Sequence, residues 1–454
     1  MCRMPAMKKF RLIIIVIACV ALCAASFFLY VNGLKNPAYV EPSQEEALSF
    51  QQAKASRYPQ PIVDSLPYPV TPAKLSVHAG AAILIDAATG SILYEKNADE
   101  VIPPASMTKL VVMYVVFQEI ATGRISLDDV VPLPPESWAV NAPPQSSLMF
   151  LAEGQIVTLR ELLLGLAVAS GNDAAVAVAH YVSGSVDAFV QRMNREMELL
   201  GLEKTHFVEP SGYSELNLTT PREFAAFARI YLSRYPESLE AFHSQPSISY
   251  PQEDNLGEWH EDKEQAIFQQ STNKLLGVLL GCDGLKTGFI YESGYNLSLT
   301  AQRGGTRFIS VTMKGPGTGS IEGNRYRVAD GTTLMEWAFS CFATHFKEEI
   351  RPVSVPVLGG EKNSVAVAPL HTKPLTVPAL LKGQSPSMAA NAISTQINLP
   401  AYLQAPLKVG DVVGKVTYSL GDIVLEEVPL LAVTSIDEGN SFKQLVDKLA
   451  ARLF

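Results

Sequence analysis

An unbroken run of eight apolar residues, Leu110 to Phe117, constrains the fold of this 454-residue chain more than any other stretch. A helix that is apolar on every side has no face for water, so it is normally buried in the middle of a domain. The segment Pro103–Lys109 directly precedes the run and reads Pro-Pro-Ala-Ser-Met-Thr-Lys. We therefore predict a buried helix with Ser106 and Lys109 on one face of its first turn.

This pair of residues has the chemistry of an activated nucleophile. A hydroxyl nucleophile needs a base within hydrogen-bond reach, and a desolvated lysine amine can serve as that base. The unbonded N–H groups at a helix start also favour a developing anion. A capping serine followed by a solvated lysine accounts for the same residues, and for this window alone we prefer that plainer interpretation.

The N-terminus predicts export. Lys8, Lys9 and Arg11 precede an uncharged run from Leu12 to Val31, which is about the length that a membrane-spanning helix needs. An anchor of this kind would place the rest of the chain outside, at the outer face of the membrane.

Three interpretations of this leader remain open. The length of the run and its aromatic end, Phe27 to Val31, favour an uncleaved anchor. A signal peptide cleaved at the small residues Cys23-Ala24-Ala25 is the second, and lipid attachment at Cys19 is the third. All three export the protein.

Composition excludes several classes of function. The net charge of −9 argues against nucleic-acid binding, which usually requires a basic face. Three of the five cysteines lie in the leader, and Cys282 and Cys341 alone form no disulfide framework. The cysteines and histidines show no metal-ligand spacing, so we expect neither a metal nor a cofactor.

The pattern along the chain predicts an α/β (α+β) protein with a small all-β module at its end. A hairpin over 82–94 and alternating strands over 284–290, 295–300 and 307–313 indicate an antiparallel sheet, which a last helix over Thr333–Phe346 covers. The predicted segments are a membrane anchor or signal (1–35), a linker (36–75), a main domain (76–350), an all-β domain (351–440) and a C-terminal amphipathic helix (441–454). The last could lie at a membrane interface or dock on the all-β domain.

Two further motifs follow Ser106-x-x-Lys109 along the chain. Ser170-Gly171-Asn172 falls in a turn between two predicted helices, and Lys286-Thr287-Gly288 falls on a predicted strand. A Ser-x-x-Lys spacing alone means little, because Ser271-Thr272-Asn273-Lys274 also satisfies it in polar sequence without a buried helix behind it. The evidence for a common site is the order of the three motifs together with their local structures, and no single spacing is sufficient.

These motifs closely resemble the Ser-x-x-Lys, Ser-x-Asn and Lys-Thr-Gly triplet of penicillin-recognising serine enzymes. The chain is similar to the low-molecular-mass penicillin-binding proteins that are D-alanyl-D-alanine carboxypeptidases, from about Val77 to the C-terminus. The resemblance continues through Gly294-Tyr295-Asn296-Leu297 and into 405–410, Ala-Pro-Leu-Lys-Val-Gly. It implies a serine β-lactamase/transpeptidase-like domain, with a sheet flanked by helices, a mostly helical lobe, and the site between them.

The resemblance also implies a role for each motif residue. Ser106 would attack the bond between the two terminal D-alanines of a peptidoglycan stem peptide, and Lys109 would take its proton. Ser170 would relay a proton to the leaving amine, and Asn172 would hold the substrate amide and Lys109.

The Lys-Thr-Gly strand would bind the other end of the substrate. Lys286 and Thr287 would bind the terminal carboxylate, and Gly288 would let the substrate backbone approach the strand. Backbone N–H groups of Ser106 and Phe289 would form the oxyanion hole. β-Lactams would acylate Ser106. Many relatives have His-Thr after Lys-Thr-Gly, whereas this chain has Phe289-Ile290, which puts side-chain contacts with the substrate there in question.

Three other functions fit parts of the pattern. An endopeptidase that cuts D-amino-acid cross-links would use the same residues. A serine β-lactamase shares the triplet, but the all-β module and the membrane leader count against it. A catalytically silent peptidoglycan-binding protein of the envelope would be expected to lose one of the catalytic residues, and all are present.

Overall fold

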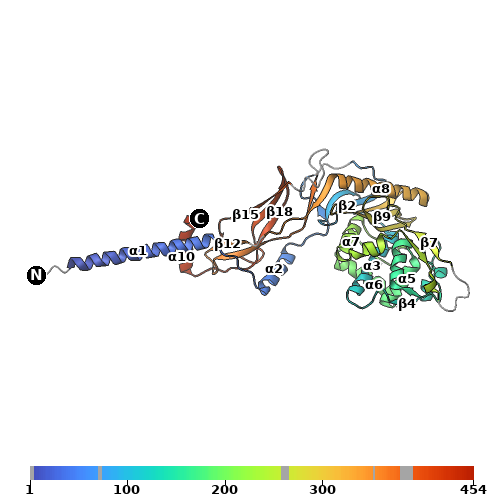
Figure 1. Ribbon diagram of the computed structural model, residues 1–454, viewed down its shortest axis with the longest axis horizontal. Coiled ribbons are helices and arrows are strands. Elements are labelled where there is room, and N and C mark those ends of the chain that lie inside the picture. Colours follow the sequence, from blue (N-terminus) through green and yellow to red (C-terminus); the bar gives the residue numbers. More distant parts are fainter. Residues whose placement is uncertain (1–4, 70–73, 257–264, 351–352, 379–391) are drawn as a thin grey trace. The chain divides into compact units, whose positions relative to one another are not determined.

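The structure is a computed structural model that describes residues 5–69, 74–256, 265–350, 353–378 and 392–454 (Figure 1). It divides into two compact units. The larger unit comprises 62–345 and 374–391, and the smaller unit comprises 1–61, 346–373 and 392–454. The expected boundary at 350/351 borders residues 351–352, which lie outside the described part.

An almost entirely antiparallel sheet forms the middle of the larger unit. Its strand order is β1-β3-β2-β10-β9-β8, and β1–β3 is its parallel pair. The strands are β1 (Asp64–Ser65), β2 (Ala81–Asp86), β3 (Ser91–Lys96), β8 (Cys282–Ile290), β9 (Gly294–Arg303) and β10 (Thr306–Gly315). Strand β8, which carries Lys286-Thr287-Gly288, is therefore an edge strand, and half of its backbone groups face away from β9.

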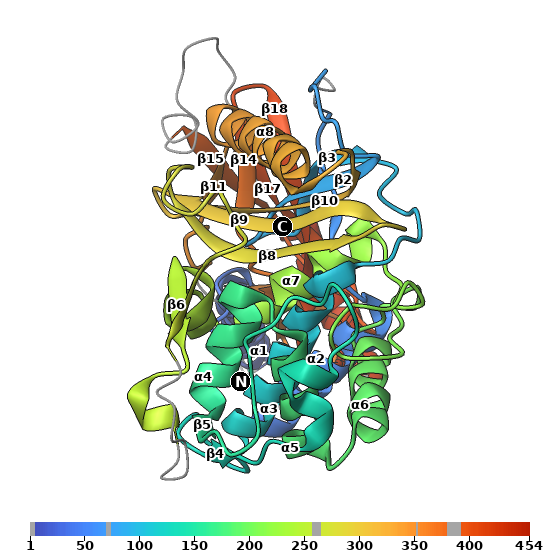
Figure 2. The same ribbon diagram turned by 90° about the vertical axis from the view of Figure 1, so that its right-hand side faces the viewer.

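The two faces of this sheet belong to two separate cores. Because side chains alternate along a strand, Ile83 and Ile85 point to one core while Ala82 and Leu84 point to the other. Helix α8 (Ser320–Cys341) covers one face, and α7 (Pro221–Arg234) with the helical lobe covers the opposite face, as Figure 2 shows.

The predicted buried helix is confirmed. It is α3 (Lys109–Ala121), whose residues Leu110 to Val116 are completely buried. The other helices of the lobe surround it: α4 (Leu159–Leu164), the π-helix η4 (Gly165–Ala169), α5 (Asn172–Ser183) and α6 (Val186–Leu199). Thr158 and Glu161 form a capping box at the start of α4.

Short elements complete the larger unit. They are η1 (Ala105–Thr108), β4 (Val130–Val131), η2 (Pro135–Ser137), η3 (Ala139–Asn141), β5 (Val157–Thr158), η5 (Leu239–His243), β6 (Ser247–Tyr250), η6 (Glu253–Asn255), β7 (Ile267–Gln270), β11 (Phe342–His345) and β14 (Leu375–Pro378). β4 pairs with β5, β6 with β7 and β11 with β14.

The expected last helix, over 333–346, was placed too late in the sequence. Helix α8 already begins at Ser320, and β11 follows it directly from Phe342. Gly323 and Gly331 lower the helix propensity of the first turns, but tertiary packing needs them. A Cβ at Gly323 would lie 2.2 Å from the Tyr295 ring, and one at Gly331 would lie 2.7 Å from Leu275.

The smaller unit is the expected all-β module together with helices from both chain ends. Its sheet has the order β15-β17-β18-β13-β12-β16. The elements are α1 (Pro5–Lys35), α2 (Gln44–Arg57), β12 (Val353–Leu358), β13 (Ser364–Pro369), β15 (Ile393–Asn398), β16 (Leu403–Gln404), β17 (Val412–Leu420), β18 (Ile423–Ala432), α10 (Ser441–Ala450) and η7 (Ala451–Leu453).

The segment 36–75 was expected to be a linker, and in the structure it contains the helix α2. Ser43 and Glu46 form a capping box at its start, and Arg57 at its end binds Asp411 (3.1 Å) and the Val409 carbonyl (2.8 Å). The polar composition that suggested a linker also suits a surface helix held at its two ends.

Candidate active site

The Ser106 turn is a short 3₁₀ helix that leads directly into the buried helix α3. Ala105 has a φ of +52°, an uncommon conformation for a residue with a side chain. The amide of Asn296 donates to the Pro103 carbonyl (2.9 Å) and fixes the entry to the turn. The result is a rigid turn that leaves Ser106 partly exposed while its neighbours Met107 and Thr108 are buried.

Lys109 lies completely buried beneath Ser106. Its Nζ donates to Ser106 Oγ (3.1 Å), to Asn172 Oδ1 (2.7 Å) and to the Ser211 carbonyl (2.5 Å). Burial lowers the pKa of Lys109 to about 7, although the charges of Glu209 and Asp173 act in the opposite direction. A neutral amine can keep two donors on Asn172 and Ser211 and turn its lone pair to the Ser106 hydroxyl.

The second motif sits where the π-helix η4 ends and α5 begins. Ser170 adopts a left-handed conformation (φ +61°), which ends one helix and lets the next begin at Asn172. Asp173 accepts hydrogen bonds from the N–H groups of Met149, Phe150 and Leu151 (2.8 to 3.1 Å). This buried carboxylate therefore holds the loop that forms one wall of the site.

The third motif brings a second buried lysine to Ser170. Lys286 Nζ donates to Ser170 Oγ (2.9 Å) and to the Thr287 carbonyl (3.0 Å). Burial, and then the charges of Lys109 and Arg327, lower the pKa of Lys286 well below its usual value. A carboxylate bound beside it would restore the charged form, so the site is suited to an anion.

Gly288 serves a purpose that the sequence did not suggest. A Cβ there would lie 2.5 Å from the Pro104 carbonyl oxygen and 3.1 Å from the Ala105 side chain. The resemblance implies that this glycine makes room for substrate, and its missing side chain also lets β8 lie directly against the protein's own nucleophile turn.

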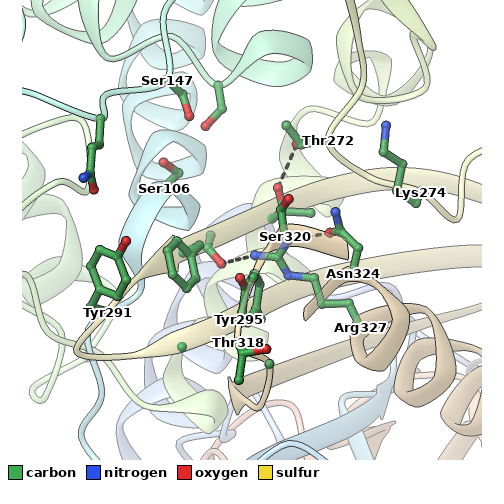
Figure 3. A pocket seen from close by; sticks show the side chains of 18 of the residues that line it. Ser106, Ser147, Thr272, Lys274, Tyr291, Tyr295, Thr318, Ser320, Asn324 and Arg327 are labelled. Atoms are coloured by element: carbon green, nitrogen blue, oxygen red, sulfur yellow. Dashed lines mark hydrogen bonds between the residues drawn. The ribbon is translucent and has the colours of Figure 1, made fainter. Parts of the chain in front are cut away.

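The predicted residues meet at a groove that passes over Ser106. A cavity of about 760 Å³ is lined by Ser106, Ser170, Thr287, Gly288 and Phe289. Figure 3 shows Ser106 in this cavity, with Arg327 and Tyr295 further along it. A second cavity of about 420 Å³, which shares Ser106 and Phe289 with the first, is also lined by Asn172. Lys109 and Lys286 lie beneath the groove rather than in its lining. The structure thus brings all eight predicted residues together around one hydroxyl.

Sequence reasoning missed Arg327, which comes from helix α8. Its guanidinium lines the larger cavity, donates to the Gly288 carbonyl and lies 4.8 Å from the Tyr295 ring centre. Burial lowers the pKa of Arg327 to about 10, so it remains charged at neutral pH. No motif marks it, because only the packing of α8 on the sheet brings this residue to the groove.

Sequence reasoning also misjudged the Ser271–Lys274 segment, which was set aside as polar sequence. Thr287 Oγ1 donates to Thr272 Oγ1 (2.7 Å), and Thr272 and Lys274 line the larger cavity. The segment is indeed no helix start, yet it forms the wall next to the Lys-Thr-Gly strand.

Phe289, where many relatives have histidine, forms an aromatic edge of the groove. Its ring centre lies 4.4 Å from that of Tyr295 and 5.4 Å from that of Tyr291. This part of the groove offers apolar contact and the backbone of β8 rather than a polar side chain.

Comparison with known proteins agrees with this geometry. The model of the D-alanyl-D-alanine carboxypeptidase family matches residues 68–317, and that of the penicillin-binding protein 5 C-terminal domain matches residues 343–438. The carboxypeptidase DacC of Escherichia coli (strain K12) is 33% identical over 378 residues, which cover 82% of this chain and 88% of that protein.

This chain is also similar to a protein of known structure and to an endopeptidase. The crystal structure of penicillin binding protein 5 from Haemophilus influenzae has a TM-score of 0.66 and 30% identity, and covers 82% of this chain and 100% of that one. A D-alanyl-D-alanine endopeptidase of Pseudomonas aeruginosa is 29% identical over 280 residues, but these cover 59% of this chain and 79% of that protein. With the motif geometry, these matches show that the chain belongs to the D-alanyl-D-alanine carboxypeptidase family of penicillin-binding serine peptidases.

Proposed function

We propose that Ser106 is the nucleophile with which this carboxypeptidase removes the terminal D-alanine from peptidoglycan stem peptides. One observation carries the proposal: a completely buried lysine amine, with its pKa lowered to about 7, lies 3.1 Å from Ser106 Oγ. A lysine of this kind can accept the hydroxyl proton near neutral pH.

In the acylation step, Ser106 Oγ attacks the carbonyl carbon of the penultimate D-alanine while Lys109 takes its proton. The N–H groups of Ser106 and Phe289 stabilise the oxyanion. The C–N bond then breaks, and the proton that Lys109 took passes to the leaving amine through the Ser170 hydroxyl, which Lys286 Nζ holds in place at 2.9 Å; Lys109 is then neutral again. Water hydrolyses the ester with Lys109 as base.

Recognition of the free carboxylate rests on the cations beside the groove. Lys286 lies under Ser170, Thr287 lines the cavity, and the Arg327 guanidinium lines it further along. Desolvated cations favour a carboxylate and disfavour an amidated end, which suits an enzyme that acts at chain termini.

Among the alternatives, cross-link endopeptidase activity has some support in the size of the larger cavity, about 760 Å³, which exceeds what a single alanine fills. We still favour the carboxypeptidase, because DacC matches 82% of this chain against 59% for the endopeptidase, and residues 343–438 match the C-terminal domain of penicillin-binding protein 5. The geometry also speaks against a silent binder, since Ser106, Lys109 and Ser170 all have their hydrogen bonds in place.

Incubation with a D-Ala-D-Ala peptide and with a fluorescent penicillin tests the assignment. Wild type should release D-alanine and carry covalent label, and Ser106→Ala should do neither. Ser271→Ala, in the second Ser-x-x-Lys, is the matched control and should still be labelled. Label on Ser106→Ala would refute the nucleophile, and fast penicillin turnover without D-alanine release would favour a β-lactamase.

We further propose that α1 is retained as the membrane anchor at the outer face. Its segment Ile13–Lys35 is long and apolar enough to cross a membrane, as a signal sequence also can be. Its last turns belong to the core of the smaller unit: Val31 and Leu34 are buried beside Leu358 and Ala450.

A polar contact joins the two ends of the chain within this unit. Tyr30 donates to the buried carboxylate of Asp447 (2.5 Å), which also accepts from Lys443 (2.6 Å) and from the Gly359 N–H (2.7 Å). Loss of α1 would leave part of this carboxylate unsatisfied, which is costly.

One face of α10 and η7 carries exposed apolar side chains, namely Phe442, Leu445, Leu449 and Leu453. This exposed face of α10 suits the membrane interface, while the buried face of the helix packs against the sheet of the smaller unit. N-terminal sequencing of carbonate-washed membranes tests retention, and a mature protein lacking residues 1–25 would contradict it.

A further inference from the structure

One carboxylate outside the three motifs organises the loop beneath the nucleophile. Glu209 lies at the start of the loop 209–217, and its side chain accepts hydrogen bonds from several groups of that loop. The donors are Ser211 N (2.7 Å), Ser211 Oγ (2.5 Å), Gly212 N (2.7 Å), Ser214 N (3.3 Å) and Asn217 Nδ2 (2.8 Å). The loop is thus folded around a single negative charge.

The same loop touches the catalytic turn through three groups. The Ser211 carbonyl accepts from Lys109 Nζ (2.5 Å), and Asn217 Nδ2 donates to Thr108 Oγ1 (3.3 Å). Between them, Gly212 packs so closely that a Cβ there would lie 1.9 Å from the Ala105 carbonyl oxygen and 2.7 Å from Ser106 N. Any shift of the loop would move Lys109 or the backbone of Ser106.

Glu209 also acts on Lys109 through its charge. Two carboxylates, Glu209 and Asp173, favour the protonated form of this amine, and the charge of Lys109 in turn helps to lower the pKa of the nearby Lys286. Glu209 has the larger effect of the two carboxylates. It therefore limits how far burial can lower the pKa of Lys109, and so how much of the amine is neutral at a given pH.

We propose that Glu209 is a positioning residue for catalysis, which fixes the loop 209–217 against the Ser106 turn and balances the charge of Lys109. The proposal rests on the assignment of Lys109 as the base that activates Ser106. Glu209 touches neither the groove nor the reacting atoms, and it acts through Ser211, Gly212 and Asn217.

The test is the pH dependence of the second-order rate of acylation by a fluorescent penicillin. Glu209→Gln removes the charge but keeps an amide oxygen for the loop, so the acidic limb of the profile should move to lower pH. Glu209→Ala also removes the acceptor, and acylation should slow on the order of 100-fold at its best pH, as expected for small displacements of reacting groups. Thermal melting shows whether each variant is folded.

Glu203→Gln is the matched control. Glu203 is exposed and, within the described ranges, forms no hydrogen bond or ion pair, so the same loss of one charge should leave the profile unchanged. An acidic limb at the wild-type position in folded Glu209→Gln would overturn the proposal, as would wild-type acylation by Glu209→Ala.

The outcome also separates this inference from the proposed function. If wild type itself has no acidic limb, or if Ser106→Ala is labelled, the assignment of the catalytic pair fails. If wild type has the limb and Ser106→Ala is inert while both Glu209 variants behave as wild type, the role of Glu209 alone is refuted.

Discussion

Acidification should switch off acylation through a single group, Lys109. Its pKa of about 7 means that the amine is mostly neutral above pH 8 and mostly protonated below pH 6. Only the neutral amine can accept the Ser106 proton. At pH 5, two units below the pKa, about 1% of the amine is neutral, so the rate should be roughly 100-fold below its plateau near pH 9.

The assay is the second-order rate of fluorescent penicillin acylation between pH 5 and 9, with circular dichroism at each pH to confirm the fold. The logarithm of the rate should rise with a slope of about one below pH 7 and then level off. Lys109→Arg is a useful comparison, because guanidinium keeps a cation in place but does not lose its proton in this range. It should be nearly inactive at every pH.

A rate that stays flat from pH 5.5 to 8 would refute the reasoning, because a base with this pKa cannot be silent there. A slope that appears equally in Lys109→Arg would place the titrating group elsewhere. Lys286 is the obvious candidate, since its pKa is also lowered by burial and it bonds Ser170.

Three further predictions concern groups around the site. Arg327→Gln should lower kcat/KM about 10- to 100-fold for a peptide that ends in a free carboxylate and far less for its amide, because one charge-assisted contact is lost. Gly212→Ala should destabilise the larger unit by about 2 kcal/mol or more, because residue 212 has a φ of +81° and the added Cβ would meet the Ala105 carbonyl. Thermal unfolding measures this, and a wild-type melting temperature would contradict it. Burial lowers the pKa of His243 to about 3 in the folded protein, so on acidification the imidazole takes up a proton in the unfolded state before it does so in the folded state. The free energy of unfolding should therefore fall as the pH drops from 6.5 toward 3, by up to about 1.4 kcal/mol per pH unit. His243→Gln should flatten that part of the stability curve, and an unchanged slope would assign the effect to other groups.

The sequence by itself determined the features that are local in the chain. The apolar run 110–117 can only be buried, and it is α3. Ser106 and Lys109 are close because they are three positions apart on one helical turn. The hairpin 82–94 forms because two apolar strands flank a turn that contains Gly90. The other two motifs were identified through a family resemblance, and the comparisons confirm the family.

Tertiary structure decided what depends on distant segments. Arg327 reaches the groove because α8 packs on the sheet, and the start of that helix was misplaced because Gly323 and Gly331 lower helix propensity but are required by Tyr295 and Leu275. Glu209 carries no motif, and its importance appears only when its loop lies against the Ser106 turn. Propensity and spacing report neighbours along the chain, whereas the burial that lowers the pKa of Lys109 comes from residues more than sixty positions away.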